Sequence, residues 1–290
     1  MCNFRQIMIG ILCSWVLVGT VSSAVAQERD PEFEQEILDR LEAINPEAVP
    51  IFEQATQAMD AYDSRVAISG FNQVLELAPD FPDALRRLSS AELQLGLLDD
   101  ALSHAQQAFD LDPSAINKIN LAEKLTATAK PINTSKALTL AQEAVQELPD
   151  DTYAYYVLMF AAFEQKDNES LRYACETLFR IAPEYPVSHY FYSLVMAEDG
   201  RWEQAERELL IARDLGLPAE EIDRILQETG IAHQARLFRT ARWSGYTVAA
   251  WLGGMGVLFF MGIILSKATL SAAQRTQSRA DAQIGPGRRY

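Results

Sequence analysis

Five prolines divide the middle of the chain into units of nearly equal length. Pro79, Pro113, Pro149, Pro183 and Pro218 are separated by 34, 36, 34 and 35 residues. A run of apolar residues at helical spacing precedes each of them, as in FNQVLELAP and AQQAFDLDP. Proline ends a helix because it lacks a backbone N–H and its ring clashes with the preceding turn. A period of this length therefore predicts a stack of similar helical units.

Small side chains recur at fixed distances before these prolines. Twelve positions earlier, with a one-residue shift at the last proline, stand Ala67, Ala101, Ala137 and Ala205, and Leu171 is the exception. A second set of small or apolar residues stands five positions before the prolines: Val74, Ala108, Ala144, Leu178 and, with the same shift, Ala212. Small side chains allow neighbouring helices to approach closely, and Gly96 and Gly200 fall where a turn between two helices is expected.

This combination of period, prolines and small residues resembles the tetratricopeptide repeat, a helix-turn-helix unit of about 34 residues. The resemblance covers residues 48–218 as five units and implies an all-α, helix-turn-helix solenoid. Two departures stand out: the third unit has two extra residues around 130–133, which leaves its helix register open, and the signature Trp of the first helix is missing.

Flanking helices are expected at both ends of the repeats. Residues 27–47 predict a capping helix, from Glu32 to Ile44, that begins after Asp30 and Pro31. Residues 219–243 predict a terminal helix, from Glu220 to Phe238, and a juxtamembrane segment. Both helices would cover the open ends of a solenoid, which needs polar caps to be soluble.

The first 26 residues have the three parts of a secretory leader. Arg5 precedes an uncharged run from Ile7 to Val18, and small residues follow up to Ala26. We expect cleavage after Ala26; alternatively the segment stays as an uncleaved anchor, because residues 7–26 carry no charge over the length that a bilayer requires. Either way, the repeats are expected outside the cytoplasm.

Residues 244–266 contain no charged side chain and are long enough to cross a membrane. Basic residues flank this segment equally on both sides, so they do not decide its orientation in the membrane. The leader decides it, because export of the repeats leaves residues 267–290 in the cytoplasm as a short basic tail. We thus expect a single-pass protein of the bacterial inner membrane with its repeats in the periplasm. Gly245, Ala249 and Gly253 form a small-residue stripe that could pair two such helices into a homodimer.

Charge argues against a nucleic-acid partner. Residues 27–235 contain 39 acidic and 16 basic side chains, whereas residues 236–290 contain 1 acidic and 8 basic ones. Binding to nucleic acid depends on basic side chains that neutralise phosphates. The acidic repeats instead favour basic segments of partner proteins at long range, although a solvated acidic surface is the simpler interpretation.

The resemblance implies a concave groove, lined by the first helix of each unit, that binds a protein or peptide partner. If the resemblance holds, the following residues face that groove: Phe52, Met59, Arg86, Leu93, Tyr153, Tyr156, Phe160, Phe163 and Tyr190. We expect Phe160 and Phe163 to pack within the stack instead. Some members of the family bind a C-terminal carboxylate through paired Lys, Arg and Asn; only Arg86 and Arg87 offer this chemistry here, so that function is not expected.

No enzyme, cofactor or metal motif is evident. None of the three histidines lies in a zinc-ligand spacing, no phosphate-binding loop or nucleophile motif occurs, and acidic pairs such as Asp99 and Asp100 fit helix starts. Cys175, the one cysteine beyond the leader, fits a small core residue. A second hypothesis remains open: an exported repeat region before a membrane helix looks somewhat like the leading part of larger membrane zinc peptidases, whose catalytic domain this chain does not contain.

Overall fold

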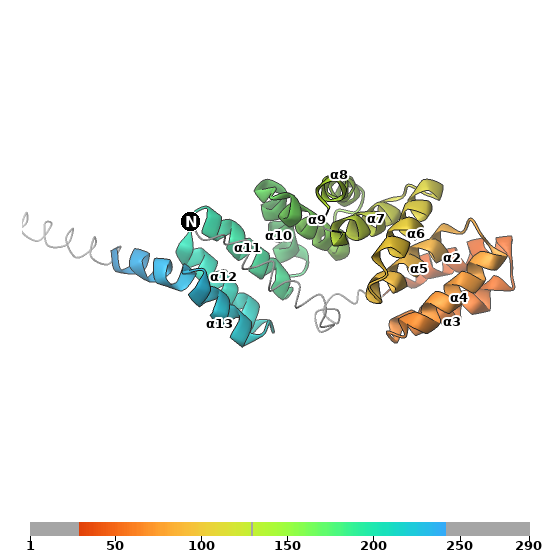
Figure 1. The fold of residues 1–290 in the computed structure, drawn as a ribbon, viewed down its shortest axis with the longest axis horizontal. Helices are drawn as coiled ribbons and strands as arrows, with labels where there is room; N and C mark the ends of the chain where they lie inside the picture. The colour runs from red at the N-terminus through yellow and green to blue at the C-terminus, as the bar shows by residue number, and fades with distance from the viewer. Residues whose placement is uncertain (1–28, 129, 242–290) are drawn as a thin grey trace, which may run out of the picture. The chain divides into compact units, whose positions relative to one another are not determined.

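The computed structural model describes residues 29–128 and 130–241 of the 290-residue chain. Within these residues the regular secondary structure is all helical and contains no strand (Figure 1). The helices are α2 (Pro31–Ile44), α3 (Ala48–Asp60), α4 (Ser64–Leu77), α5 (Pro82–Gln94), α6 (Leu98–Leu111), α7 (Ala115–Ala127), α8 (Pro131–Glu147), α9 (Thr152–Gln165), α10 (Asn168–Ile181), α11 (Pro186–Glu198), α12 (Trp202–Asp214) and α13 (Ala219–Glu228).

Helices α3 to α12 form five consecutive pairs, α3/α4 to α11/α12, each joined by a short turn and packed side by side. The second helix of each pair ends shortly before one of the five periodic prolines, which confirms the all-α repeat fold. Both sets of periodic residues are buried, since all of them are at most 1% exposed. Gly70 shows how close the helices come: a Cβ added there would lie 2.7 Å from Ala55 Cβ of the partner helix.

Acidic side chains mark several helix starts. The carboxylates of Asp30, Asp63, Asp151 and Asp167 accept hydrogen bonds from backbone N–H groups in the first turns of α2, α4, α9 and α10. The N-terminal N–H groups of a helix have no partner within the helix, and an acidic side chain also complements the helix dipole. These carboxylates therefore act as helix caps. The expected pair Asp99 and Asp100 lies in the first turn of α6, as predicted, but that helix has no side-chain cap.

The turns inside the first, second, fourth and fifth pairs each use one left-handed residue. Gly96 and Gly200 have φ values of +75° and +73°, and the same place in the first and fourth pairs is taken by Tyr62 (φ 57°) and Lys166 (φ 60°). In the third pair Lys130 has φ −85° and directly precedes α8, which has 17 residues against 13 or 14 in the other second helices. The two extra residues of this unit thus lengthen a helix.

The apolar core is divided into two parts. The first core runs from Ile37 to Ala91 over helices α2–α5, and the second runs from Ala105 to Ile231. Polar side chains occupy the contact between α5 and α7, where Ser89 Oγ donates to Asn120 Oδ1 at 2.9 Å inside the protein. These buried polar groups separate the two apolar cores.

The helix expected from Glu220 to Phe238 is interrupted. α13 ends at Glu228, Gly230 has φ +72°, and residues 231–241 are helical again. The described residues up to Ala232 form one compact unit, and those from His233 onward belong to a second one. Among the described helices, none combines the length and the apolarity needed to cross a membrane. The expected leader (1–26), membrane span (244–266), glycine stripe and basic tail (267–290) lie outside the described residues.

Candidate functional site

The expected groove residues lie on the first helices of the pairs, which are α3, α5, α9 and α11. Their exposure differs widely. Phe52, Phe163 and Tyr190 are buried, with at most 5% of their surface exposed, whereas the following residues are half-buried: Met59, Arg86, Leu93, Tyr153, Tyr156 and Phe160. The surface of the first helices is therefore covered at Phe52 on α3 and at Tyr190 on α11, and it is partly open along α9.

Helix α2 covers the part of this surface on α3 and α5. Ile37 and Leu41 of α2 are fully buried in the first core together with Phe52, which is 1% exposed. The ring of Phe52 also contacts Phe71 and Phe81 edge-on, with centroids 5.7 and 5.8 Å away. As the structure stands, Phe52 is a core residue that α2 keeps from any ligand.

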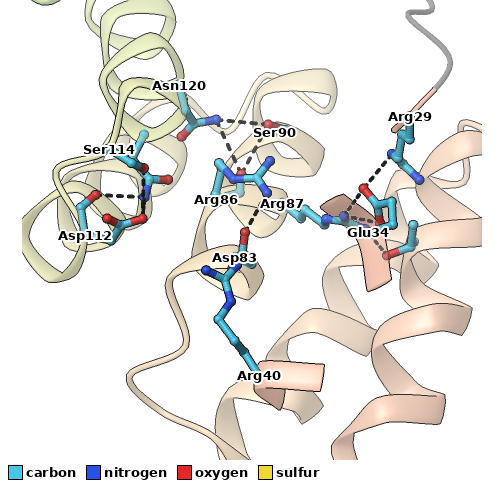
Figure 2. A network of polar contacts seen from close by, with 12 residues as sticks. Arg29, Glu34, Arg40, Asp83, Arg86, Arg87, Ser90, Asp112, Ser114 and Asn120 are labelled. Atoms are coloured by element: carbon cyan, nitrogen blue, oxygen red, sulfur yellow. Dashed lines mark hydrogen bonds and ion pairs between the residues drawn. The ribbon is translucent and has the colours of Figure 1, made fainter. Parts of the chain in front are cut away.

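Arg87 of α5 anchors α2 through a buried ion pair (Figure 2). Its guanidinium donates to the Glu34 carboxylate of α2 at 2.5–2.6 Å and to Thr56 Oγ1 at 2.6 Å, and its Cζ lies 4.6 Å from the Phe52 ring centroid. Only 3% of its side chain is exposed. Burial lowers the pKa of Arg87 to about 10, and the hydrogen bond to Glu34 opposes that shift. Arg87 is thus committed to holding α2.

A second ion pair connects α2 to the start of α5. The largely buried carboxylate of Asp83 accepts from Arg40 of α2 at 2.8 Å and from Arg86 of its own helix at 2.7 Å. Figure 2 shows Asp83 between the two arginines. Arg86, the expected groove residue, is therefore already paired within the chain.

Helix α7 adds polar residues beside Arg86. Asn120 Nδ2 donates to Ser90 Oγ at 3.1 Å and to the Arg86 carbonyl at 3.4 Å, as drawn in Figure 2. Lys124, which is 1% exposed, donates to Ser90 Oγ at 3.3 Å and pairs with the Glu123 carboxylate. These groups satisfy one another, so this polar cluster stabilises the contact between α5 and α7.

Tyrosine and phenylalanine rings gather on α9 and α11. We call the half-buried rings of Tyr153, Tyr156 and Phe160, with the buried Tyr185 beside them, the tyrosine patch. Tyr153 and Tyr156 are stacked with centroids 5.8 Å apart and an interplanar angle of 15°. Tyr156 contacts Phe160 at 4.7 Å and Tyr185 at 6.0 Å. Such rings offer large apolar contact areas with few rotatable bonds.

The hydroxyl groups of the patch remain protonated. Burial raises the pKa of Tyr153 and Tyr156 above the ordinary value, and the nearby Glu123 carboxylate raises both further. The buried hydroxyl of Tyr185 has no hydrogen-bond partner among the described residues. The Tyr153 hydroxyl is hydrogen-bonded to Glu123 and that of Tyr185 is buried, so the patch offers mainly aromatic faces, which suit a peptide segment with apolar groups.

The sequence prediction missed four residues around this surface: Asn120, Glu123, Lys124 and Tyr185. Asn120 and Lys124 stand 34 residues after Arg86 and Ser90, so they occupy equivalent places in the next repeat. That spacing could have revealed them, but the register of the third unit was left open. No sequence signal indicated that α2 would cover Phe52.

The described residues contain no group of three His, Cys, Asp or Glu side chains that could hold a metal ion. Cys175 is fully buried, and burial raises the pKa of its thiol well above the ordinary value. A thiol in that state is a poor nucleophile because the thiolate is the reactive form. Cys175 is a core residue.

No protein-family model matches the chain, and no curated protein matches it. Solved structures do. PilW, described as a widely conserved type IV pilus biogenesis factor, has a TM-score of 0.57 and 16% identity over 68% of this chain and 92% of its own. MamA from Desulfovibrio magneticus RS-1 has a TM-score of 0.52 and 16% identity over 59% of this chain and 96% of its own.

YrrB, described as a TPR protein with an unusual peptide-binding site, has a TM-score of 0.51 and 15% identity over 66% of this chain and 97% of its own. At these identities the likeness concerns the fold. The repeat length, the five helix pairs and the buried small residues agree with it. Together they show that the chain has the tetratricopeptide repeat fold.

Proposed function

We propose that this protein is a scaffold without catalytic activity, and that it binds a segment of a partner protein at the tyrosine patch. The observation that carries the proposal is the stacked, half-buried pair Tyr153 and Tyr156 on α9. Tyrosines of this kind are frequent among the residues that dominate binding energy at protein interfaces. The YrrB structure supports a peptide ligand by its description, although it shares only the fold with this chain.

The covered and open parts of the first-helix surface favour this location. α2 buries Phe52, and the ion pairs of Arg86 and Arg87 occupy the polar groups of α5. Tyr153, Tyr156 and Phe160 of the tyrosine patch, by contrast, keep part of their surface exposed. The excess of acidic side chains in residues 27–235 adds a long-range attraction for a partner segment that carries basic residues.

Site-specific crosslinking in cells that produce this protein tests the proposal. A photoreactive phenylalanine analogue at position 153 should give one defined crosslinked product. Tyr156→Ala in the same chain should remove that product, because truncating a central aromatic residue costs about 2 kcal/mol or more of binding free energy. The product would be identified by mass spectrometry.

Tyr173 provides the matched control. It is a tyrosine on the second helix α10, its side chain is 53% exposed, and it lies outside the patch. The analogue at position 173 should give no such product, and circular dichroism should show that Tyr156→Ala leaves the helices intact. The same product from position 173, or one from position 153 that survives Tyr156→Ala, would contradict the proposal.

We also propose that the repeats are exported and tethered to the membrane. The support is the leader-like composition of residues 1–26 and the uncharged segment 244–266. In this arrangement the tyrosine patch meets its partner on the periplasmic side of the inner membrane. A tethered scaffold has the advantage that its partner is captured close to the membrane surface.

A further inference from the structure

Helix α2 occupies a surface that belongs to two other helices. Its apolar side chains Phe33, Ile37 and Leu41 follow one another at intervals of four residues, so they form one face. Ile37 and Leu41 are fully buried and Phe33 packs against the same core. This face fits against α3 and α5 as an amphipathic helix fits a binding surface.

Charged side chains define the register of α2 on that surface. Glu34 meets Arg87, Arg40 meets Asp83, and near the start of the helix Arg29 makes two hydrogen bonds to Asp60 at 2.6 and 2.8 Å. An acidic residue of α2 thus faces a basic one on α5, and a basic residue of α2 faces an acidic one. The surface is complementary to one particular helix, and every copy of the chain carries that helix.

A short link connects α2 to the helix it covers. Only residues 45–47 lie between Ile44 and Ala48. Asn45 has an extended backbone (φ −155°, ψ 106°), as expected for a residue that precedes proline, so α2 and α3 do not continue into one helix. A change of backbone angles in these three residues could carry α2 away from its own α3 and α5.

We propose that two copies of this chain exchange their α2 helices, so that the α3–α5 surface of each copy binds α2 of the other. Exchange keeps the contacts of α2 and alters only the link, so the contact free energies of the monomer and the exchanged dimer differ little. A higher protein concentration then shifts the equilibrium toward the dimer. The exchanged dimer is an interaction of its own, separate from partner binding at the tyrosine patch.

A charge-reversal mixture of full-length chains tests the exchange. One chain carries Glu34→Arg and the other carries Arg87→Glu, and each chain bears a different affinity tag. Within either chain, α2 then meets a like charge on α5. Exchange between the two chains restores opposite charges at both contacts, so the mixture should co-purify about tenfold more than either variant with itself, equivalent to about 1.4 kcal/mol.

The ion pair between Lys118 of α7 and Glu147 of α8 supplies the control, with Nζ 2.7 Å from the carboxylate. A mixture of Lys118→Glu and Glu147→Lys chains should co-purify no more than either variant with itself, because α7 and α8 belong to one repeat and are not exchanged between chains. Any association through residues 244–266 would raise both mixtures equally. A single chain with both Glu34→Arg and Arg87→Glu should fold with wild-type helicity.

Equal co-purification in the two mixtures would overturn the proposal. If the chain with Arg87→Glu alone fails to show helical circular dichroism, a cysteine trap replaces the mixture. Arg40→Cys and Asp83→Cys in one chain, treated with a bismaleimide crosslinker about as long as the arginine side chain it replaces, should give a covalently linked dimer on a denaturing gel at high protein concentration, because the two cysteines stand too far apart for a direct disulfide. A product that is monomeric at every concentration would overturn the proposal as well. Neither result bears on crosslinking at position 153, so the two proposals fail separately.

Discussion

At the scale of single residues, the turns inside the helix pairs carry identifiable strain. Lys166 adopts a left-handed backbone with φ 60° at the place where Gly96 and Gly200 stand in other repeats. A side chain with a Cβ is disfavoured there by roughly 1–2 kcal/mol, whereas glycine is not. The Lys166 side chain is exposed, so its removal sacrifices little packing.

Lys166→Gly should therefore stabilise the protein, by about 0.5–1 kcal/mol after the extra backbone entropy of glycine in the unfolded chain is counted. Chemical denaturation followed by circular dichroism measures the change. Lys130→Gly is the control, because Lys130 is also a lysine in a turn inside a helix pair but has an ordinary φ of −85° directly before α8. Lys130→Gly should not raise the free energy of unfolding, and an equal rise from both variants would disprove the strain argument.

At the scale of helices, the division into two apolar cores predicts independent local stability. Leu41 belongs to the first core and Leu178 to the second, and both are fully buried among apolar side chains. Replacing a buried leucine with alanine typically costs about 2–5 kcal/mol. In a repeat array this cost acts mainly on the neighbouring repeats.

Hydrogen exchange of backbone amides should resolve the two cores. Leu41→Ala should speed exchange in α2–α5 and leave α9–α12 nearly unchanged, whereas Leu178→Ala should do the reverse. The polar contact between α5 and α7, with Ser89 and Asn120 at its centre, is the boundary. If either variant accelerates exchange evenly along α2–α12, the chain unfolds as one cooperative unit and the prediction is wrong.

At the scale of the whole molecule, the proposed tether predicts the side of the membrane on which the repeats lie. Protease added to intact spheroplasts should digest the repeats, because an exported domain is accessible from outside. A cytoplasmic protein in the same sample should survive, which controls for leakage. Repeats that are spared in intact spheroplasts and digested only after lysis would place them in the cytoplasm.

The sequence alone determined the repeat. Proline ends a helix by its own covalent structure, so Pro79, Pro113 and the later prolines set the helix ends without reference to the rest of the fold. The small residues at fixed distances, such as Ala67 and Ala101, predicted where helices touch, because small side chains let neighbouring helices approach closely. These signals are local, and for that reason they can be read along the chain.

Only the tertiary structure decided what covers the surface of the first helices. The sequence predicted a helix near residues 32–44 and groove residues on α3 and α5, but Glu34 and Arg87 are 53 positions apart and no spacing rule connects them. The separation of the two cores likewise depends on which side chains meet between α5 and α7. Such contacts form between segments distant in sequence, so they appear only when the chain is folded.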